Sequence, residues 1–296
     1  MTLTVRVPAS SANLGPGFDC LGLALALYNE IRISAASIPH ISITGEGEHD
    51  LRRDPSNLAY RCATIGYQLS GRAAPAFALE LRNAIPLSRG LGSSSTAIVG
   101  GLLAGATLAG LRLSREELVT KAAEIEGHPD NVAPAVYGGC TVAVVANGVQ
   151  VAPIPFPAGL RALVYVPTRR LPTAKARGVL PETVSRADAV FNLGRTALLV
   201  AALWADRRDL LPIACEDRLH QDARAALIPA LPRVLAAARE AGARLVALSG
   251  AGPSILALVD ERDEEVAAAM AAAAGSELPG RVLPLAIARE GVTVER

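Results

Sequence analysis

The sequence predicts an α+β protein with two domains, on three observations. Strand-like apolar runs dominate the first part of the chain, and helical segments begin later. The proline-rich stretch 153–157 is the best domain boundary, so we expect one domain over residues 1–152 and another over residues 153–296. The segments after it follow the order strand, helix, helix, strand, strand, helix, strand, which is typical of a split βαβ sandwich. A chain of 296 residues is long enough for two domains.

The first domain is expected to hold most of the strands. Residues 3–7 alternate between apolar and polar and stop at Pro8, and residues 41–44 alternate again. The remaining expected strands are residues 28–34 (after the apolar run 20–27), 77–81 and 141–145, the last one ending at the hairpin signal Asn147-Gly148.

Helices in the first domain are indicated by caps and small residues. A turn at residues 54–57 should start a helix over 58–69, with Asn57 as N-cap. A helix rich in small residues is expected over 97–108. Ser114 and Glu117 match a capping box, so another helix should run to Glu126 and end at Gly127.

The second domain alternates between helices and strands. Its expected strands are residues 161–166, 245–248, 255–259 and 281–288. Its expected helices are residues 185–204, 207–211, 216–226, 231–241 and 264–273.

Composition excludes several classes of protein. Apolar residues make up 51% of the chain, charged residues 19%, and the net charge is +1, which indicates a compact fold and not a disordered chain. There is no run rich in Lys and Arg, so a nucleic-acid role has little support. The four cysteines are too scattered for a zinc or redox pair. No signal peptide is visible and residues 97–111 are too short to span a bilayer, so we expect a cytoplasmic protein without a membrane role.

The most informative stretch is a glycine- and serine-rich loop before the helix at 97–108. It consists of Pro86, Leu87, Ser88, Arg89, Gly90, Leu91, Gly92, Ser93, Ser94, Ser95 and Thr96. Glycines let a ligand approach the backbone closely, and a helix start opened by serines offers free N–H groups and hydroxyls to an anion. The alternative is an ordinary connector with Ser93 or Ser94 as N-cap. It is not a Walker loop, because neither of the two lysines follows a glycine.

Polar residues in other loops could hold a substrate. Asn13 and Asp19 lie in a glycine-containing loop that could otherwise be a surface turn. His128, Asp130 and Asn131 gather in a proline-containing loop, although His128 could be an ordinary loop histidine.

Charged residues offer partners for charged ligand groups. Arg177 and Arg224 are candidate forks for a carboxylate, although most arginines of this chain should be surface residues. Glu124 and Glu126 precede the histidine loop, and a carboxylate near the serines would complete a hard-cation site. Residues 249–254 are either a hairpin turn or a second anion-binding loop.

Taken together, these motifs resemble the GHMP kinases, a family named for galactokinase, homoserine kinase, mevalonate kinase and phosphomevalonate kinase. Three family signatures occur in order, at residues 8–19, 86–96 and 249–254. Residues 8–19, 128–134 and 173–181 are similar to the branch of the family that acts on homoserine. The resemblance implies an N-terminal domain like ribosomal protein S5, with an unusual left-handed crossover, a ferredoxin-like C-terminal domain, and an active site between them.

The resemblance also implies a nucleotide and a metal. The loop 86–96 would bind ATP, with Gly90 to Ser94 around its phosphates and Asn57 near the adenine. Ser94 and Glu124 would hold Mg²⁺. Glu126 remains an alternative to Glu124, because the loop that leads to His128 is shorter here than in some members.

The implied substrate is L-homoserine, whose phosphorylation feeds threonine synthesis. It would lie against Asn13, Asp19, His128, Asp130 and Asn131, with its carboxylate on Arg177 and Arg224. The candidate catalytic residues are Asn131 and His128. Asn131 stands where mevalonate kinase has an aspartate and cannot take a proton, so catalysis is expected to rest on positioning and charge neutralisation.

Two other functions remain open at this point. The chain could be a kinase for another small alcohol such as mevalonate, or a ligand-binding regulator that has lost catalysis on the same fold. Arg177, Arg224 and Asp19 favour an amino acid over mevalonate, which has no ammonium group. A homodimer is also an expectation from the family.

Overall fold

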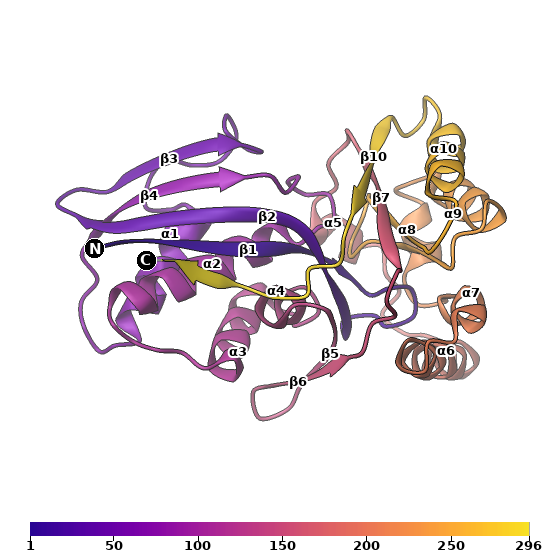
Figure 1. Ribbon diagram of the computed structural model, residues 1–296, viewed down its shortest axis with the longest axis horizontal. Coiled ribbons are helices and arrows are strands. Elements are labelled where there is room, and N and C mark those ends of the chain that lie inside the picture. The colour runs from indigo at the N-terminus through magenta and orange to yellow at the C-terminus, as the bar shows by residue number, and fades with distance from the viewer. Residues whose placement is uncertain (296) are drawn as a thin grey trace.

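The computed structural model describes residues 1–295, which fold around two β-sheets placed end to end (Figure 1). The larger sheet has seven strands and the smaller one four. The predicted α+β class is therefore confirmed.

The larger sheet is built around its longest strand, β2 (Leu21–Ala36). Its strand order is β11-β1-β2-β4-β3, and β5 pairs with β2 and β6. Only β3 and β4 pair in parallel. The other strands are β1 (Thr2–Ala12), β3 (His40–Gly45), β4 (Ala76–Asn83), β5 (Cys140–Val145), β6 (Val149–Ile154) and β11 (Thr293–Glu295).

Helices cover one face of the larger sheet. They are α1 (Leu58–Gln68), α2 (Ser93–Leu108), α3 (Arg115–Glu126) and α4 (Val132–Tyr137). Val5, Ile31 and Leu79 point from the strands into the core they share with α2, whereas Arg6 and Arg32 lie on the exposed face. This alternation follows from the two-residue repeat of a strand.

The smaller sheet has the order β10-β7-β9-β8, which numbered along the chain is 4-1-3-2, the arrangement expected of a ferredoxin-like sandwich. Its strands are all antiparallel and are β7 (Arg161–Pro167), β8 (Leu245–Leu248), β9 (Ile255–Val259) and β10 (Gly280–Leu285). Its helices are α5 (Thr173–Arg177), α6 (Arg186–Trp204), α7 (Leu211–Ala214), α8 (Gln221–Ala225), α9 (Leu231–Glu240) and α10 (Asp263–Ala274), with the short 3₁₀ helix η1 (Arg208–Leu210) before α7.

Both faces of the smaller sheet are covered. Leu163 and Tyr165 pack with α9 and α10, while the alternate residues Ala162 and Val164 pack with α6 and α7. The hydrophobic cluster around Ala162 and Val164 also contains Leu21 and Leu23 of β2, so one core joins the two sheets.

The ends of the chain differ most from the sequence-based expectations. β1 does not stop at Pro8 but continues to Ala12, with a shift of register between Pro8 and Ala9, because a proline is tolerated at a bulge. The expected last strand ends at Leu285. The three residues of β11 then return to the larger sheet and pair with β1, so the chain ends lie close together (Figure 1).

Several further segments depart from expectation. The apolar run 20–27 and the strand at 28–34 form one continuous strand, β2. The helix expected over 216–226 forms only at Gln221–Ala225, after a loop held by Asp217. The short helices α4 and α5 were not expected.

Candidate functional site

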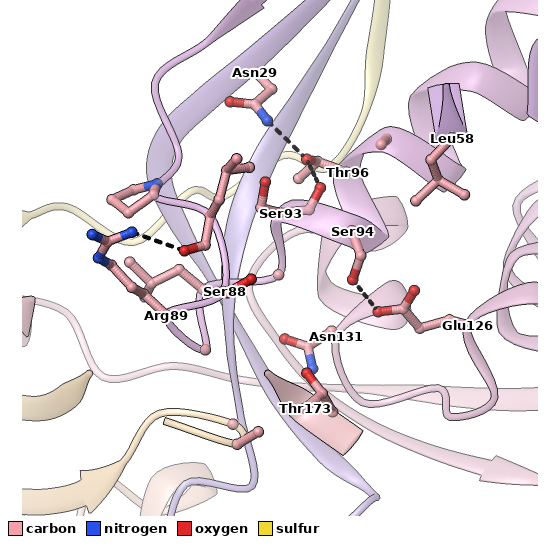
Figure 2. A pocket seen from close by; sticks show the side chains of 18 of the residues that line it. Asn29, Leu58, Ser88, Arg89, Ser93, Ser94, Thr96, Glu126, Asn131 and Thr173 are labelled. Atoms are coloured by element: carbon pink, nitrogen blue, oxygen red, sulfur yellow. Dashed lines mark hydrogen bonds between the residues drawn. The ribbon is translucent and has the colours of Figure 1, made fainter. Parts of the chain in front are cut away.

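A cavity of about 430 Å³ lies between the two sheets and is called the central cavity below. Residues from both sequence halves line it, from Asn13 to Ala251. Figure 2 shows the glycine- and serine-rich loop, the start of α2 and Glu126 around it. The cavity therefore gathers motifs that are far apart in the sequence.

The segment 86–96 forms one wall of the cavity: residues 86–92 are a loop, and residues 93–96, which lie before the helix start expected at 97, form the first turn of α2. The N-cap of α2 is Gly92, which has a left-handed φ of 70° and offers no side chain as a cap, so neither Ser93 nor Ser94 is the N-cap. Gly90 also has a positive φ, and a Cβ there would lie 2.1 Å from the carbonyl oxygen of Ser249. The hydroxyl of Ser249 donates to the carbonyl of Gly90 at 2.7 Å. The backbone of this loop thus lies against the glycine-rich loop 249–254, which the sequence also singled out.

The serine hydroxyls at the start of α2 meet a carboxylate of α3. Ser94 Oγ donates to Glu126 Oε1 at 2.6 Å (Figure 2). Ser95 Oγ donates to the same oxygen at 2.9 Å. The expectation that Glu124 lies beside the serines is wrong, because Glu124 accepts from Lys121 at 2.8 Å on the exposed side of α3. Residues two apart on a helix point about 200° away from each other, so only one of the two glutamates can face the cavity.

A chain of polar side chains continues from Glu126 around the cavity. His128 Nδ1 lies 2.5 Å from Asp130 Oδ1, which also accepts from the backbone N–H of Asn131 at 2.9 Å. Asn131 Oδ1 accepts from Ser10 Oγ at 2.9 Å. The structure thus brings His128, Asp130 and Asn131 together, and the amide of Asn131 is fixed from β1.

His128 is held next to negative charge. Burial alone would lower the pKa of His128, but the hydrogen bond and the charge of Asp130 oppose this effect. Together with the charge of Glu126, they raise the pKa of His128 above its ordinary value. The imidazole is therefore biased towards its cationic form at the cavity wall.

Opposite charges meet at the other end of the cavity, called the substrate end below. Arg177 donates to both carboxylate oxygens of Asp19, at 3.0 and 2.7 Å, and both side chains are about one-third exposed. Arg224, in contrast, is a buried residue at 1% exposure, although it lines the same cavity. The sequence-based alternative of a surface residue is therefore wrong for Arg224, whereas Arg177 is partly exposed at the cavity wall.

Asn13 and Asn57, two of the three asparagines expected to contact ligands, already have partners within the protein. Asn13 Nδ2 donates to the carbonyl of Gly250 at 3.0 Å, and its Oδ1 accepts from the N–H of Asp19 at 3.1 Å. Asn57 Oδ1 caps α1 by accepting from Ala59 N–H at 3.0 Å, and its Nδ2 donates to the carbonyl of Arg52 at 2.8 Å. Both residues line the cavity, and both hold their own loops in place.

Sequence reasoning missed two of the residues that support the site. Ser10 lies within the first motif but carried no signal of its own. His220 precedes α8 and stands four residues before Arg224, a spacing that could have pointed to their contact, whereas its contact with the loop that contains Asp19 arises only in the folded chain.

Comparison with known proteins assigns the chain to a family. The family model of the GHMP kinases N terminal domain matches residues 57–139, and that of the GHMP kinases C terminal matches residues 199–277. The chain belongs to the GHMP kinase family. The resemblance inferred from the motifs is confirmed.

Curated and solved relatives of this GHMP kinase narrow the comparison. It is 47% identical over 293 residues to the homoserine kinase of Desulfitobacterium hafniense, covering 98% of this chain and 99% of that one. It is 48% identical to that of Moorella thermoacetica, with 91% of each chain covered. The crystal structure of homoserine kinase from Cytophaga hutchinsonii matches with a TM-score of 0.89 at 29% identity, over 99% of this chain and 97% of that one.

Proposed function

We propose that this kinase transfers the γ-phosphate of ATP to the side-chain hydroxyl of L-homoserine, giving O-phospho-L-homoserine for threonine synthesis. One observation carries the proposal: the central cavity joins a helix start suited to phosphate to the ion pair of Arg177 and Asp19. A nucleotide phosphate fits the first, and a ligand with both an ammonium and a carboxylate fits the second. The relatives named homoserine kinase support the same substrate.

The nucleotide would lie along the loop 86–96. Its phosphates would accept hydrogen bonds from the backbone N–H groups at the start of α2, where the helix dipole favours negative charge. Leu51, Leu58 and Leu87 line the same cavity and suit the adenine ring. Asn57 would shape this end through the cap of α1, since both groups of its amide are already bonded.

The donors beside the phosphate site fit Mg²⁺. Mg²⁺ prefers oxygen ligands and is commonly held by one or two protein groups together with substrate phosphates. Glu126 and Ser94 supply such oxygens. We therefore propose that Ser94 and Glu126 hold the metal, with Glu126 in place of the expected Glu124. When bound, the ion would neutralise phosphate charge, while Glu126 and the serines hold it at the helix start.

The alcohol would lie between the phosphate loop and the substrate end. Asp19 would bind the ammonium group, and Arg177 with Arg224 the carboxylate, so that the hydroxyl faces the polar chain of His128, Asp130 and Asn131. Asn131, fixed by Ser10, has no proton affinity. The raised pKa of His128 favours its cationic form, so this side chain would offset the negative charge of the transferred phosphate instead of acting as a base. Phosphoryl transfer needs little proton removal before the transition state, so positioning and charge would account for catalysis.

The deciding experiment is ATP turnover by the purified chain with homoserine, mevalonate and other small alcohols. We expect homoserine to give the highest kcat/KM by far. A preference for mevalonate would mean that the chain acts as a mevalonate kinase. The fold allows this alternative, since a crystal structure of mevalonate kinase matches this chain with a TM-score of 0.69 at 16% identity. ATP binding without turnover of any alcohol would mean a regulator.

We propose that residues 1–152 and 153–296 are the two domains, although β6 crosses this boundary and β11 returns to the first sheet. A cytoplasmic location and a homodimer are likewise proposed.

By length and composition alone, α6 is the only helix of residues 1–295 that could cross a membrane, yet its residues Leu199 and Leu203 pack into the core. Its exposed Val190, Leu193 and Trp204 suit contact with a second copy.

A further inference from the structure

A histidine with no part in the proposed chemistry lies directly behind the substrate end of the central cavity. His220 precedes α8 and is fully buried. Its backbone N–H donates to Asp217 Oδ2 at 2.9 Å, which holds the start of the helix. Its ring stacks on Phe18, with centroids 5.2 Å apart and an angle of 27° between the rings. The backbone of His220 is therefore fixed by Asp217, and the face of its ring by Phe18.

Both ring nitrogens of His220 have partners that fix its protonation. Nε2 lies 2.8 Å from the carbonyl oxygen of Gly15, which can only accept, so Nε2 must carry the hydrogen. Nδ1 lies 3.0 Å from Arg224 Nη1, which can only donate, so Nδ1 must offer its lone pair. The geometry thus selects the neutral imidazole with its proton on Nε2.

Arg224 is oriented by three acceptors. Besides His220, the carbonyl of Gly250 accepts from Nη1 at 3.0 Å and the carbonyl of Ala176 accepts from Nε at 3.2 Å. Nη2 has no hydrogen-bond partner among residues 1–295, and Arg224 lines the central cavity. Burial lowers the pKa of Arg224 to about 10, so the side chain remains a cation at neutral pH.

We propose that His220 is a positioning residue for Arg224, which it aims at the substrate carboxylate through Nδ1; the proposal rests on the function proposed above. His220 also ties Arg224 to the loop of Asp19, since Gly15 and Asp19 belong to the same loop. The two ends of an amino acid would thus be recognised by groups that share one buried support.

Two variants separate the two hydrogen bonds of the ring. The amide oxygen and nitrogen of asparagine are three bonds from Cα, as is Nδ1 of histidine. Those of glutamine are four bonds from Cα, as is Nε2 of histidine. His220→Asn can therefore still accept from Arg224 but loses the bond to Gly15. His220→Gln can still donate to Gly15 but loses the acceptor for Arg224. A merely structural histidine would tolerate the two replacements equally badly.

The test measures KM for homoserine, KM for ATP and kcat in both variants. We expect His220→Gln to raise the homoserine KM by about tenfold or more, because a misplaced binding group costs up to about a hundredfold in such sites. The ATP KM and kcat should stay within about threefold. His220→Asn should keep the homoserine KM within about threefold of wild type. Equal effects of the two variants, or an ATP KM that rises with the homoserine KM, would overturn the proposal.

A double-mutant cycle keeps this result apart from the substrate assignment. In an Arg224→Ala background His220→Gln should add no more than about a twofold loss in homoserine kcat/KM, since the guanidinium it would disturb is absent. Additive losses would mean that His220 acts independently of Arg224. If the wild-type chain does not phosphorylate homoserine at all, the proposed function fails before any variant is compared.

Discussion

Asp19 and Arg177 form a two-pronged ion pair at the substrate end of the central cavity, with guanidinium-to-carboxylate distances of 2.7 and 3.0 Å. They come from the two halves of the chain, 158 residues apart. Without a ligand each neutralises the other. An amino acid bound here would offer an ammonium group to Asp19 and a carboxylate to Arg177, so the pair is matched in charge to a zwitterion.

Arg177→Ala should weaken homoserine binding strongly. The variant removes a carboxylate partner and leaves Asp19 without its cation, and losing one partner of a charge-assisted contact costs roughly 2–5 kcal/mol. We expect homoserine kcat/KM to fall by about 30-fold or more, with little change in ATP KM. Arg186→Ala, at an exposed position at the start of α6, is the control. Normal homoserine kinetics in Arg177→Ala would place the substrate elsewhere.

Glu126→Gln and Glu124→Gln are a matched pair for the metal site. Only Glu126 accepts from Ser94 and Ser95, whereas Glu124 is bonded to Lys121 on the exposed side of α3. Glu126→Gln should raise the Mg²⁺ concentration needed for half-maximal activity by about 10–100-fold. Glu124→Gln should change it by no more than about twofold. The reverse ranking would return the metal ligand to Glu124.

Gly90→Ala should destabilise the protein more than a comparable glycine substitution. Gly90 and Gly71 have similar φ values of 74° and 77°, but a Cβ at Gly90 would lie 2.1 Å from the backbone oxygen of Ser249, whereas Gly71 has open space. Gly71→Ala therefore measures the cost of a left-handed residue alone, about 1–2 kcal/mol. Gly90→Ala should lower the free energy of unfolding by about 1–3 kcal/mol more. Equal losses in denaturant titrations would show that the two loops separate without cost.

The pH profile of kcat tests whether His128 is a base. Asp130 and Glu126 raise the pKa of His128 against the effect of burial, which favours the cationic imidazole over the neutral form that a base needs, so we expect His128 not to accept the substrate proton. The profile between about pH 5 and 7 should then have the same shape in wild type and His128→Gln. An acid limb that disappears in the variant would identify His128 as the base.

The same pKa shift predicts a pH-dependent contribution to stability. A histidine whose folded-state pKa is raised stabilises the folded state fully below its unfolded value of 6.5, and this contribution is lost as pH rises through the raised pKa. The free energy of unfolding of wild type should therefore exceed that of His128→Gln most at about pH 5.5 and least at about pH 9. A difference that grows towards pH 9 would contradict the assignment. Denaturant titrations at both pH values provide the measurement.

Local signals in the sequence predicted much of the fold and part of the site. The capping box at Ser114 and Glu117 started α3, and Gly127 ended it, as expected. The hairpin at Asn147-Gly148 also formed, between β5 and β6. The homoserine kinase activity predicted from the motifs agrees with that of the named relatives. These features depend on residues close together in the chain or on short sequence motifs, so they can be predicted from the sequence alone.

Contacts between distant segments decided the rest. The sequence offered both Glu124 and Glu126 as metal ligands, and only the packing of α3 against α2 determined which side chain faces the serines. His220 and Arg224 stand four residues apart, a spacing at which helical side chains meet, but no pattern connected His220 with Gly15, because that hydrogen bond arises where α8 meets a loop from the start of the chain. Composition and periodicity determined which segments became helices and strands and which loops carried polar groups. Burial and the meeting of the two sheets decided which of those groups share a cavity, since hydrogen bonds and charges act over a few ångströms in space whatever their separation in sequence.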